Sequence, residues 1–176
     1  MRRHAASRVA FHVSNSNNPR AMLFLTFQLG KDRYALEASR VIEVLPLVDM
    51  KHLPNAPTGV AGLINYRGRP VPVMDLNELT LHHKSAERMS TRIILIKYPD
   101  HHGREHPLGL IAEKATSTIR REPGDFIEPG LNLAGTPYLG PVLMEDKTPI
   151  QWIYGQHLLS NEIRDKLFQA SLEESS

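Results

Sequence analysis

Short runs of apolar residues, separated by Gly, Pro, Asn and Asp, recur along the chain from residue 23 onward. Runs of this length are typical of β-strands, in which successive side chains point to opposite faces. The pattern predicts strands over residues 23–29, 33–36, 41–45, 60–64, 71–74, 91–98, 108–112, 115–119, 138–144 and 149–154. The fold class that follows is mainly β.

Residues 59–79 (GVAGLINYRGRPVPVMDLNEL) carry the clearest β-hairpin pattern in the chain. Two apolar runs flank a short glycine-containing turn at residues 66–69, and this arrangement is a hairpin signal. Pro70 and Pro72 are two residues apart, so their missing N–H groups lie on the same edge of the returning strand. We therefore predict the edge of a small barrel, closed to strand addition at the prolines.

Three short helical segments follow from capping signals and periodicity. Residues 75–78 (DLNE) match a capping box, so a short helix should begin there, and residues 37–40 are expected to form one helical turn. Near the C-terminus the apolar side chains at helical spacing are Leu159, Ile163, Leu167 and Phe168. We expect a helix over 157–172, capped by Ser160 or Asn161, that packs back on the β-structure.

The order of predicted elements in the first half of the chain recurs in the second half. Gly62 and the strand that includes Val71 correspond to Gly140 and the strand that includes Ile150. The polar residues 81–90 separate the two halves and are expected to form a linker. The recurrence predicts two similar small β-barrels within one chain.

Composition and charge narrow the classes of function. The 176 residues include no cysteine, which excludes disulfides and thiolate metal sites. The formal net charge is +2, but residues 1–21 carry four arginines and no acidic residue, which leaves −2 for residues 22–176. The body of the protein therefore lacks the basic footprint of a nucleic-acid-binding protein. No apolar run approaches the roughly 20 residues of a membrane-spanning helix.

The basic N-terminal segment, residues 1–21, is expected to be a disordered arm because it is rich in Ser, Asn and Arg and lacks apolar periodicity. An Arg-rich segment without acidic residues is also typical of organellar transit peptides, although the rest of the chain reads as bacterial. A third alternative is that Met22 is the physiological start.

Candidate catalytic and metal-binding residues are few. His101, His102 and His106 lie in one loop, but no acidic residue stands at a supporting helical spacing, so we favour an exposed turn over a metal site. The chain lacks a Gly-x-Ser-x-Gly nucleophile motif and a phosphate-binding loop. We therefore expect no cofactor, no metal and no catalytic residue, and a function carried by binding surfaces.

Two charged residues next to apolar strands are candidates for such surfaces. The predicted strand 41–45 should place Val41, Glu43 and Leu45 on one face and Ile42 and Val44 on the other. Glu43 is then either a solvated strand carboxylate or part of a surface that faces a partner. Arg67, in the hairpin turn, is either solvated or a rigidly presented guanidinium that donates to a partner.

The hairpin contains GLINYRG at residues 62–68, followed by VPVMDL at residues 71–76. Further strands contain FLTFQLG at 24–30, YAL at 34–36 and VIEV at 41–44. This ordered set resembles the CheW family of chemotaxis coupling proteins, in which the same motifs recur with the same spacing. Tyr66 departs from the family pattern, because leucine is usual at that position. The resemblance runs from about residue 23 to residue 159 and is stronger in the first half.

The resemblance implies a CheW-like domain over residues 22–159. Such a domain consists of two five-stranded, SH3-like β-barrels packed together, with short helices and a C-terminal helix. In this chain the two interleaved barrels would occupy roughly residues 23–80 and 91–154, with the C-terminal helix at 157–172.

The resemblance also implies a non-catalytic scaffold that couples methyl-accepting chemoreceptors to a CheA-type histidine kinase. Val41, Glu43 and Val44 would form the face for the kinase. Asn65, Arg67 and Gly68 would form or support a groove for the receptor's hairpin tip. The protein is expected in the cytoplasm at membrane-associated receptor arrays, monomeric on its own, without nucleic acid and without direct membrane insertion.

Three alternatives stay open. The weaker second half is compatible with a diverged adaptor of a non-motility, surface-sensing pathway. A small-barrel RNA-binding protein is disfavoured by the charge of −2 on residues 22–176 and by the lack of exposed strand aromatics. An enzyme of unassigned chemistry is disfavoured by the absence of any catalytic motif.

Overall fold

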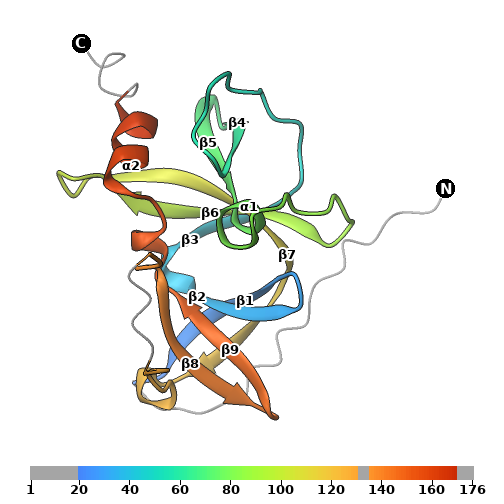
Figure 1. The fold of residues 1–176 in the computed structure, drawn as a ribbon, viewed down its shortest axis with the longest axis vertical. Coiled ribbons are helices and arrows are strands. Elements are labelled where there is room, and N and C mark those ends of the chain that lie inside the picture. Colours follow the sequence, from blue (N-terminus) through green and yellow to red (C-terminus); the bar gives the residue numbers. More distant parts are fainter. Residues whose placement is uncertain (1–19, 131–134, 170–176) are drawn as a thin grey trace.

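A computed structural model describes residues 20–130 and 135–169 of the chain (Figure 1). One sheet contains nine strands: β1 (Met22–Leu29), β2 (Asp32–Glu37), β3 (Val41–Pro46), β4 (Val60–Tyr66), β5 (Arg69–Asp75), β6 (Thr91–Pro99), β7 (Glu105–Arg121), β8 (Leu139–Glu145) and β9 (Thr148–Ile153). The helices are short: α1 (Leu76–Leu81), α2 (Asn161–Phe168) and the 3-10 turns η1 (Ala38–Arg40), η2 (Pro123–Asp125) and η3 (Gly155–His157). The predicted mainly β fold is confirmed.

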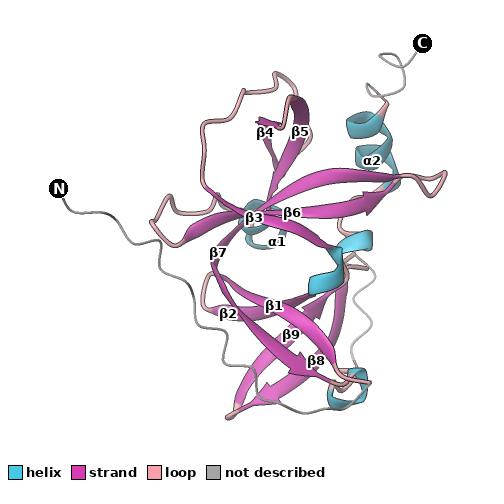
Figure 2. Ribbon diagram, turned by 180° about the vertical axis from the view of Figure 1, so that it is seen from behind, coloured by secondary structure: helices cyan, strands magenta, loops and turns pink. Residues whose placement is uncertain are grey.

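The long strand β7 belongs to two barrels at once. Its first part pairs with β6, and with β5 in parallel, whereas its last part pairs with β1. We call the group of β3, β4, β5, β6 and the start of β7 the β4 barrel. The group of β1, β2, β8, β9 and the end of β7 is the β1 barrel. The two groups lie one above the other in Figures 1 and 2, each with five strands when β7 is counted in both.

The strand pairing differs from the consecutive ranges 23–80 and 91–154 expected for the two barrels. Strands β1 and β2 pair with β7 and β9, so the β1 barrel combines both ends of the described chain. The order of local elements along a sequence does not encode such long-range pairing, which only the packing of the finished sheet decides. The interleaving of the two barrels is therefore deeper than the sequence ranges indicated.

A second difference concerns β7, which is a single strand of 17 residues where the sequence predicted two strands at 108–112 and 115–119. Lys114 interrupts the alternation with a positive φ of 50°, and the register with β1 shifts between Thr26 and Gln28. The irregularity at Lys114 bends one strand instead of ending it, as β-bulges do.

Each barrel has its own apolar core. In the β1 barrel the buried residues are Phe24, Ala35, Phe126, Leu143, Ile150 and Trp152. In the β4 barrel they are Ile64, Val71, Val73, Ile93, Leu95 and Ile111. A third and larger cluster, which includes Leu25, Ile96 and Leu108, joins the two barrels and the C-terminal helix. This shared cluster makes the described body one packed unit.

The predicted hairpin is formed by β4 and β5, and its prolines mark the free part of an edge. Pro70 and Pro72 face Asn65 and Leu63 of β4, whereas pairing of β5 with β7 begins only at Val73. Beyond that point β7 comes so close that a Cβ on Gly109 would lie 2.9 Å from Val73 Cγ2. The prolines therefore lie where β5 has no second neighbour, as predicted.

Asp75 ends β5 and caps α1, as predicted. Its carboxylate accepts hydrogen bonds from the N–H groups of Asn77 (3.0 Å) and Glu78 (3.3 Å). It also accepts hydrogen bonds from the N–H (2.8 Å) and hydroxyl (2.6 Å) of Ser85, within the expected linker 81–90. One carboxylate thus starts a helix and fastens the following loop to the β4 barrel.

The C-terminal helix packs back on the β4 barrel, as predicted. Ser160 caps it by accepting a hydrogen bond from the Ile163 N–H at 3.2 Å. Phe168 is buried and stacks on the ring of His106, with ring centroids 4.6 Å apart. The predicted range 157–172 is too long at its start, and residues 170–172 fall outside the described chain.

The predicted N-terminal arm falls, apart from Arg20 and Ala21, outside the described residues. Within the described ranges, no helix has the length and apolar character that a bilayer crossing requires.

Candidate functional site

The turn between β4 and β5 is a rigid two-residue turn. Arg67 (φ 51°) and Gly68 (φ 80°) lie between the paired residues Tyr66 and Arg69. Two consecutive positive φ values define a type I′ turn, whose twist matches that of the flanking strands. The Gly68 N–H donates a hydrogen bond to Asn65 Oδ1 at 2.9 Å, which fixes the turn from inside. Asn65 and Gly68 therefore set the direction in which Arg67 projects.

Glu43, on β3, meets this turn. Its carboxylate accepts a hydrogen bond from the Tyr66 hydroxyl at 2.6 Å and lies 3.9 Å from Arg67 Nη2. The Arg67 guanidinium carbon lies 5.2 Å from the centre of the Tyr66 ring, a cation–π distance. We call Glu43, Asn65, Tyr66, Arg67 and Gly68 the turn patch.

The turn patch is open to solvent. The Arg67 side chain is 79% exposed and the Glu43 side chain is 42% exposed. An exposed ion pair of this length stabilises a protein by about 1 kcal/mol at most, so the pair contributes little to folding. The hydrogen bond to Glu43, and to a lesser degree burial, raise the pKa of the Tyr66 hydroxyl. The patch therefore presents a phenol, a carboxylate and a guanidinium in a fixed arrangement.

A bulge in β3 changes the predicted faces of that strand. Val41 pairs with Ile96 and Glu43 pairs with the adjacent Leu95, so Ile42 is an extra residue in the strand. The bulge places Val41 on the same face as Val44, against the shared core cluster, while Glu43 points to the turn patch. The prediction that Val41 faces the same way as Glu43 is therefore wrong, because strict alternation fails at a bulge.

Val41 and Val44 line a groove between the two barrels, with a volume of about 420 Å³. Its walls come from β1, η1, β3, β6 and β7, and its lining residues are Leu25, Ala38, Val41, Val44, Arg92, Ala115, Thr116 and Thr118. The guanidinium of Arg92 is held by the backbone carbonyls of Met89 and Thr91, so it closes one end of the groove instead of reaching across it. The rest of the lining is apolar or carries only hydroxyls.

The structure thus divides the predicted site residues in a different way from the sequence. Val41 and Val44 belong to the groove, whereas Glu43 joins Asn65, Arg67 and Gly68 in the turn patch. The groove residues Leu25, Ala38 and Ala115 carry no sequence signal that distinguishes them from ordinary core positions. Tyr66 does carry a signal, because it replaces the leucine that is usual in the resembling family.

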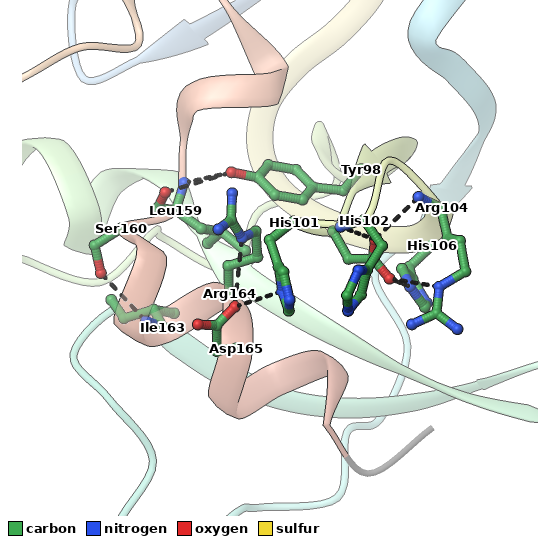
Figure 3. A network of polar contacts seen from close by, with 11 residues as sticks. Tyr98, His101, His102, Arg104, His106, Leu159, Ser160, Ile163, Arg164 and Asp165 are labelled. Carbon is green, nitrogen blue, oxygen red and sulfur yellow. Dashed lines mark hydrogen bonds and ion pairs between the residues drawn. The ribbon is translucent and has the colours of Figure 1, made fainter. Parts of the chain in front are cut away.

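The histidine-rich loop is a hydrogen-bonded structure centred on Asp100. Figure 3 shows the residues that surround this carboxylate, among them His102, Arg104 and His106. Asp100 accepts hydrogen bonds from the N–H groups of His102 (2.8 Å) and Arg104 (2.9 Å), and its carboxylate lies 2.8 Å from His106 Nε2. Burial alone raises the pKa of Asp100, but the His106 contact and these N–H groups outweigh it and hold the pKa well below its usual value. The carboxylate that supports the loop is therefore Asp100, which directly precedes His101 in the chain.

That loop does not assemble a metal site. His101 contacts Asp165 of α2, with 3.4 Å between Nδ1 and Oδ1, on the other side of the loop from His106. In the described ranges no group of three or more His, Cys, Asp or Glu side chains is arranged to hold a metal ion. The arrangement supports a docking site for α2.

A cavity of about 450 Å³ lies beneath the connection between β3 and β4. Its polar lining includes Asp75 and Thr91, whose oxygens already bond to residues of the 81–90 loop. None of the buried side-chain atoms that lack a hydrogen-bond partner belongs to a residue that lines this cavity. We therefore take the groove and the turn patch as the candidates for binding.

Comparison with known proteins gives one family. The CheW-like domain model matches residues 23–162. The chemotaxis protein CheW of Treponema pallidum is 31% identical over 61 residues, which cover 35% of this chain and 36% of the relative. CheW of Helicobacter pylori is 23% identical over 110 residues, which cover 62% of this chain and 64% of the relative. The chain thus matches less than two thirds of either relative's length.

Among solved structures, the scaffolding protein TtCheW from Thermoanaerobacter tengcongensis has the same fold, with a TM-score of 0.69 and 23% sequence identity. The superposition covers 82% of this chain and 92% of that structure. The interleaved two-barrel architecture is therefore shared with a solved relative.

Proposed function

The chain belongs to the CheW-like domain family, and we propose that it couples methyl-accepting chemoreceptors to a CheA-type histidine kinase without catalysing a reaction. The observation that carries the proposal is the groove between the barrels, together with the exposed turn patch on the opposite face of the same strand, β3. Two separate surfaces are the minimum that a protein needs to hold two partners together.

The groove is proposed to take the receptor. Receptor hairpin tips are helical, and an amphipathic helix binds by placing its apolar strip in an apolar groove. Val41, Val44 and Leu25 offer such a surface, and Thr116 and Thr118 offer polar groups at its edge. This assignment moves Val41 and Val44 from the kinase face, where the sequence analysis put them, to the receptor side.

The turn patch is proposed to take the kinase. Glu43 and Arg67 are exposed, and Ile42, which the bulge pushes outward from β3, is 40% exposed. An apolar side chain beside a rigid group of charges is a suitable protein-binding surface, because little conformational entropy is lost when a partner docks. Asn65 and Gly68 contribute by fixing the turn.

Coupling would pass through β3. Val44 lines the groove and its neighbour Glu43 holds the turn patch, so a small displacement of β3 affects both surfaces. A receptor state that changes the position of β3 would change the free energy of kinase binding, and linkage requires the reverse effect as well. No reaction on this protein is needed.

We place this function in the cytoplasm, at membrane-associated receptor arrays, with the protein monomeric before it joins an array. A non-motility pathway with the same architecture stays an alternative. RNA binding has less support, because Phe24 and Trp152, the aromatic residues of the β1 barrel core, are buried and unable to stack on bases.

Co-sedimentation with a receptor hairpin fragment and with the CheA-type kinase, tested separately, examines this proposal. Val44→Arg should weaken receptor binding roughly 10-fold or more and spare the kinase, because a charge would enter the apolar groove. Glu43→Lys should weaken kinase binding and spare the receptor. Val48→Arg, at a residue that is 43% exposed and outside both surfaces, is the control. If the wild-type chain sediments with neither partner, the proposed function is wrong.

A further inference from the structure

Three half-buried polar side chains near the start of α2 contain atoms without a partner. These atoms are buried from solvent and form no hydrogen bond with any described residue. They are Arg40 Nε, Gln156 Oε1 and Arg164 Nε. Arg40 ends η1, Gln156 lies in η3 and Arg164 is in α2. Buried polar groups nearly always have partners, so three such atoms in neighbouring elements need an explanation.

Arg40 and Arg164 lie near Tyr98, at the end of β6. Gln156 directly follows Gly155 in η3. The Arg40 side chain packs on η3, since a Cβ built on Gly155 would lie 3.6 Å from Arg40 Cδ. The Tyr98 hydroxyl accepts a hydrogen bond from the Leu159 N–H at 3.0 Å, beside Arg164 in Figure 3. Burial raises the pKa of Tyr98, and the positive charges of Arg164 and Arg40 both oppose that rise. Both guanidiniums therefore act on the same hydroxyl.

The positive charge of this cluster is poorly compensated from within the protein. Arg40 forms no side-chain hydrogen bond or ion pair with any described residue. Asp165 is the carboxylate nearest to Arg164 Nε, at 3.6 Å, which is too long for a hydrogen bond, and it also contacts His101 at 3.4 Å. Arg40 thus has no carboxylate partner, and Arg164 shares its nearest carboxylate with His101, so the two guanidiniums attract a further anion.

We propose that Arg40, Gln156 and Arg164 form a carboxylate-binding site that receives an Asp or Glu side chain of the helical hairpin in the groove. The inference rests on the proposed receptor function and deepens it. Continuity with the groove supports it, since η1 contributes Ala38 to the groove and Arg40 to this site.

The chemistry of the three side chains suits a carboxylate. Each guanidinium offers several N–H donors in a planar fork that matches two carboxylate oxygens. The Gln156 amide can turn over, because neither of its polar atoms bonds to a described residue, and its NH₂ group then becomes a third donor. The half-buried position of the site favours one inserted side chain over a flat phospholipid surface, which needs fully exposed cations.

The test uses the full chain, labelled with ¹⁵N, and the receptor hairpin fragment as the probe. The side-chain Nε–Hε signals of Arg40 and Arg164 should shift as the fragment is added. Arg40→Gln and Arg164→Gln should each weaken fragment binding roughly 10-fold, as expected for one charge-assisted hydrogen bond. The fold-loss of fragment affinity in the double variant should be smaller than the product of the two single-variant losses, because both arginines hold one carboxylate. Lys97→Gln, which removes an exposed cation from the same strand as Tyr98, should bind like the wild type.

The outcomes separate this inference from the proposed function. If the fragment binds the wild type and Val44→Arg loses it, but both arginine variants bind normally, only the carboxylate site is wrong. If the fragment does not bind the wild type, the receptor function fails and this inference fails with it. If inorganic phosphate shifts the two signals and the fragment does not, the cluster is an anion site unrelated to the hairpin, which also overturns the proposal. Unchanged circular dichroism spectra would confirm that the variants are folded.

Discussion

The Tyr66 hydroxyl donates a 2.6 Å hydrogen bond to the carboxylate of Glu43, and this contact joins two strands that are not neighbours in the sheet. Tyr66 ends β4, which pairs with β5, whereas Glu43 lies on β3, which pairs with β6. The contact therefore fixes the hairpin turn against the edge strand of the β4 barrel. It is also the link between the groove and the turn patch on which the proposed coupling depends.

The pKa of Tyr66 gives the first prediction. The hydrogen bond to Glu43 raises this pKa above the ordinary value of 10.0, so the bond stabilises the fold while Tyr66 is neutral. The stabilisation is fully present below the unfolded-state pKa and is lost as pH rises through the raised folded-state value. Titration of tyrosinate absorbance should show one tyrosine whose pKa falls in Glu43→Gln.

Tyr66→Phe is the matching unfolding experiment. The variant should unfold at a lower urea concentration than the wild type at neutral pH, and the difference should shrink above the folded-state pKa of Tyr66. Tyr154→Phe is the control, because the Tyr154 hydroxyl forms no hydrogen bond with a described residue. Equal midpoints for Tyr66→Phe and the wild type at neutral pH would mean that the Glu43 contact does not persist in solution.

The lowered pKa of Asp100 predicts how the stability of the protein changes at acidic pH. Its folded-state pKa lies well below the ordinary value of 3.8, so its contribution to stability is fully present above that value and is lost as pH falls through the folded-state pKa. Asp100→Asn should therefore lower the free energy of unfolding at neutral pH and make less difference at about pH 2. Urea unfolding at both pH values measures this. A penalty that is the same at both would show that the carboxylate charge is unimportant.

Gly109→Ala tests the close approach of β5 and β7. The new Cβ would lie 2.9 Å from Val73 Cγ2 and 3.1 Å from Ile93 Cγ2, both in the core of the β4 barrel. Overpacking of this kind should lower the free energy of unfolding by about 1–3 kcal/mol. Gly124→Ala is the control, because no heavy atom lies within 4 Å of the added Cβ. A neutral Gly109→Ala variant would contradict the parallel pairing.

Asp75→Ala tests the double role of that carboxylate. It should lower the free energy of unfolding by about 1–3 kcal/mol, because a helix cap is lost and buried donors lose their acceptor. Amide hydrogen exchange should also accelerate in residues 81–90, since both bonds to Ser85 disappear. Asp49→Ala, at an exposed residue, should change neither quantity. Unchanged exchange in the loop would show that Ser85 is held by other contacts.

Local features of this fold could be predicted from the sequence because each depends on a few adjacent residues. The Asp75 cap, the glycine turn at Gly68 and the proline-marked edge of β5 are of this kind. The pairing of β2 with β9 and of β5 with β7 could not, because alternation of apolar residues shows that a strand exists and not which strand lies beside it.

In the candidate site, too, single residues could be predicted from the sequence but the contacts between them could not. Glu43 and Arg67 could be selected as candidates, but their proximity and the role of Tyr66 depend on a tertiary contact between β3 and the turn. The bulge at Ile42 reverses the expected face of Val41, and nothing in the sequence of β3 marks the bulge. Arg40 is far in sequence from Gln156 and Arg164, so only the folded chain shows that Arg40 and Arg164 both approach Tyr98.

The pairing of β2 with β9 has a consequence for how the protein is made. The β1–β2 hairpin emerges early from the ribosome, but the strand that pairs with β2, β9, ends at Ile153. Until that residue is translated, the growing polypeptide carries an unfinished barrel with apolar residues such as Phe24 uncovered. Nascent chains of this protein should therefore depend on chaperones for longer than a protein whose barrels follow one another along the gene.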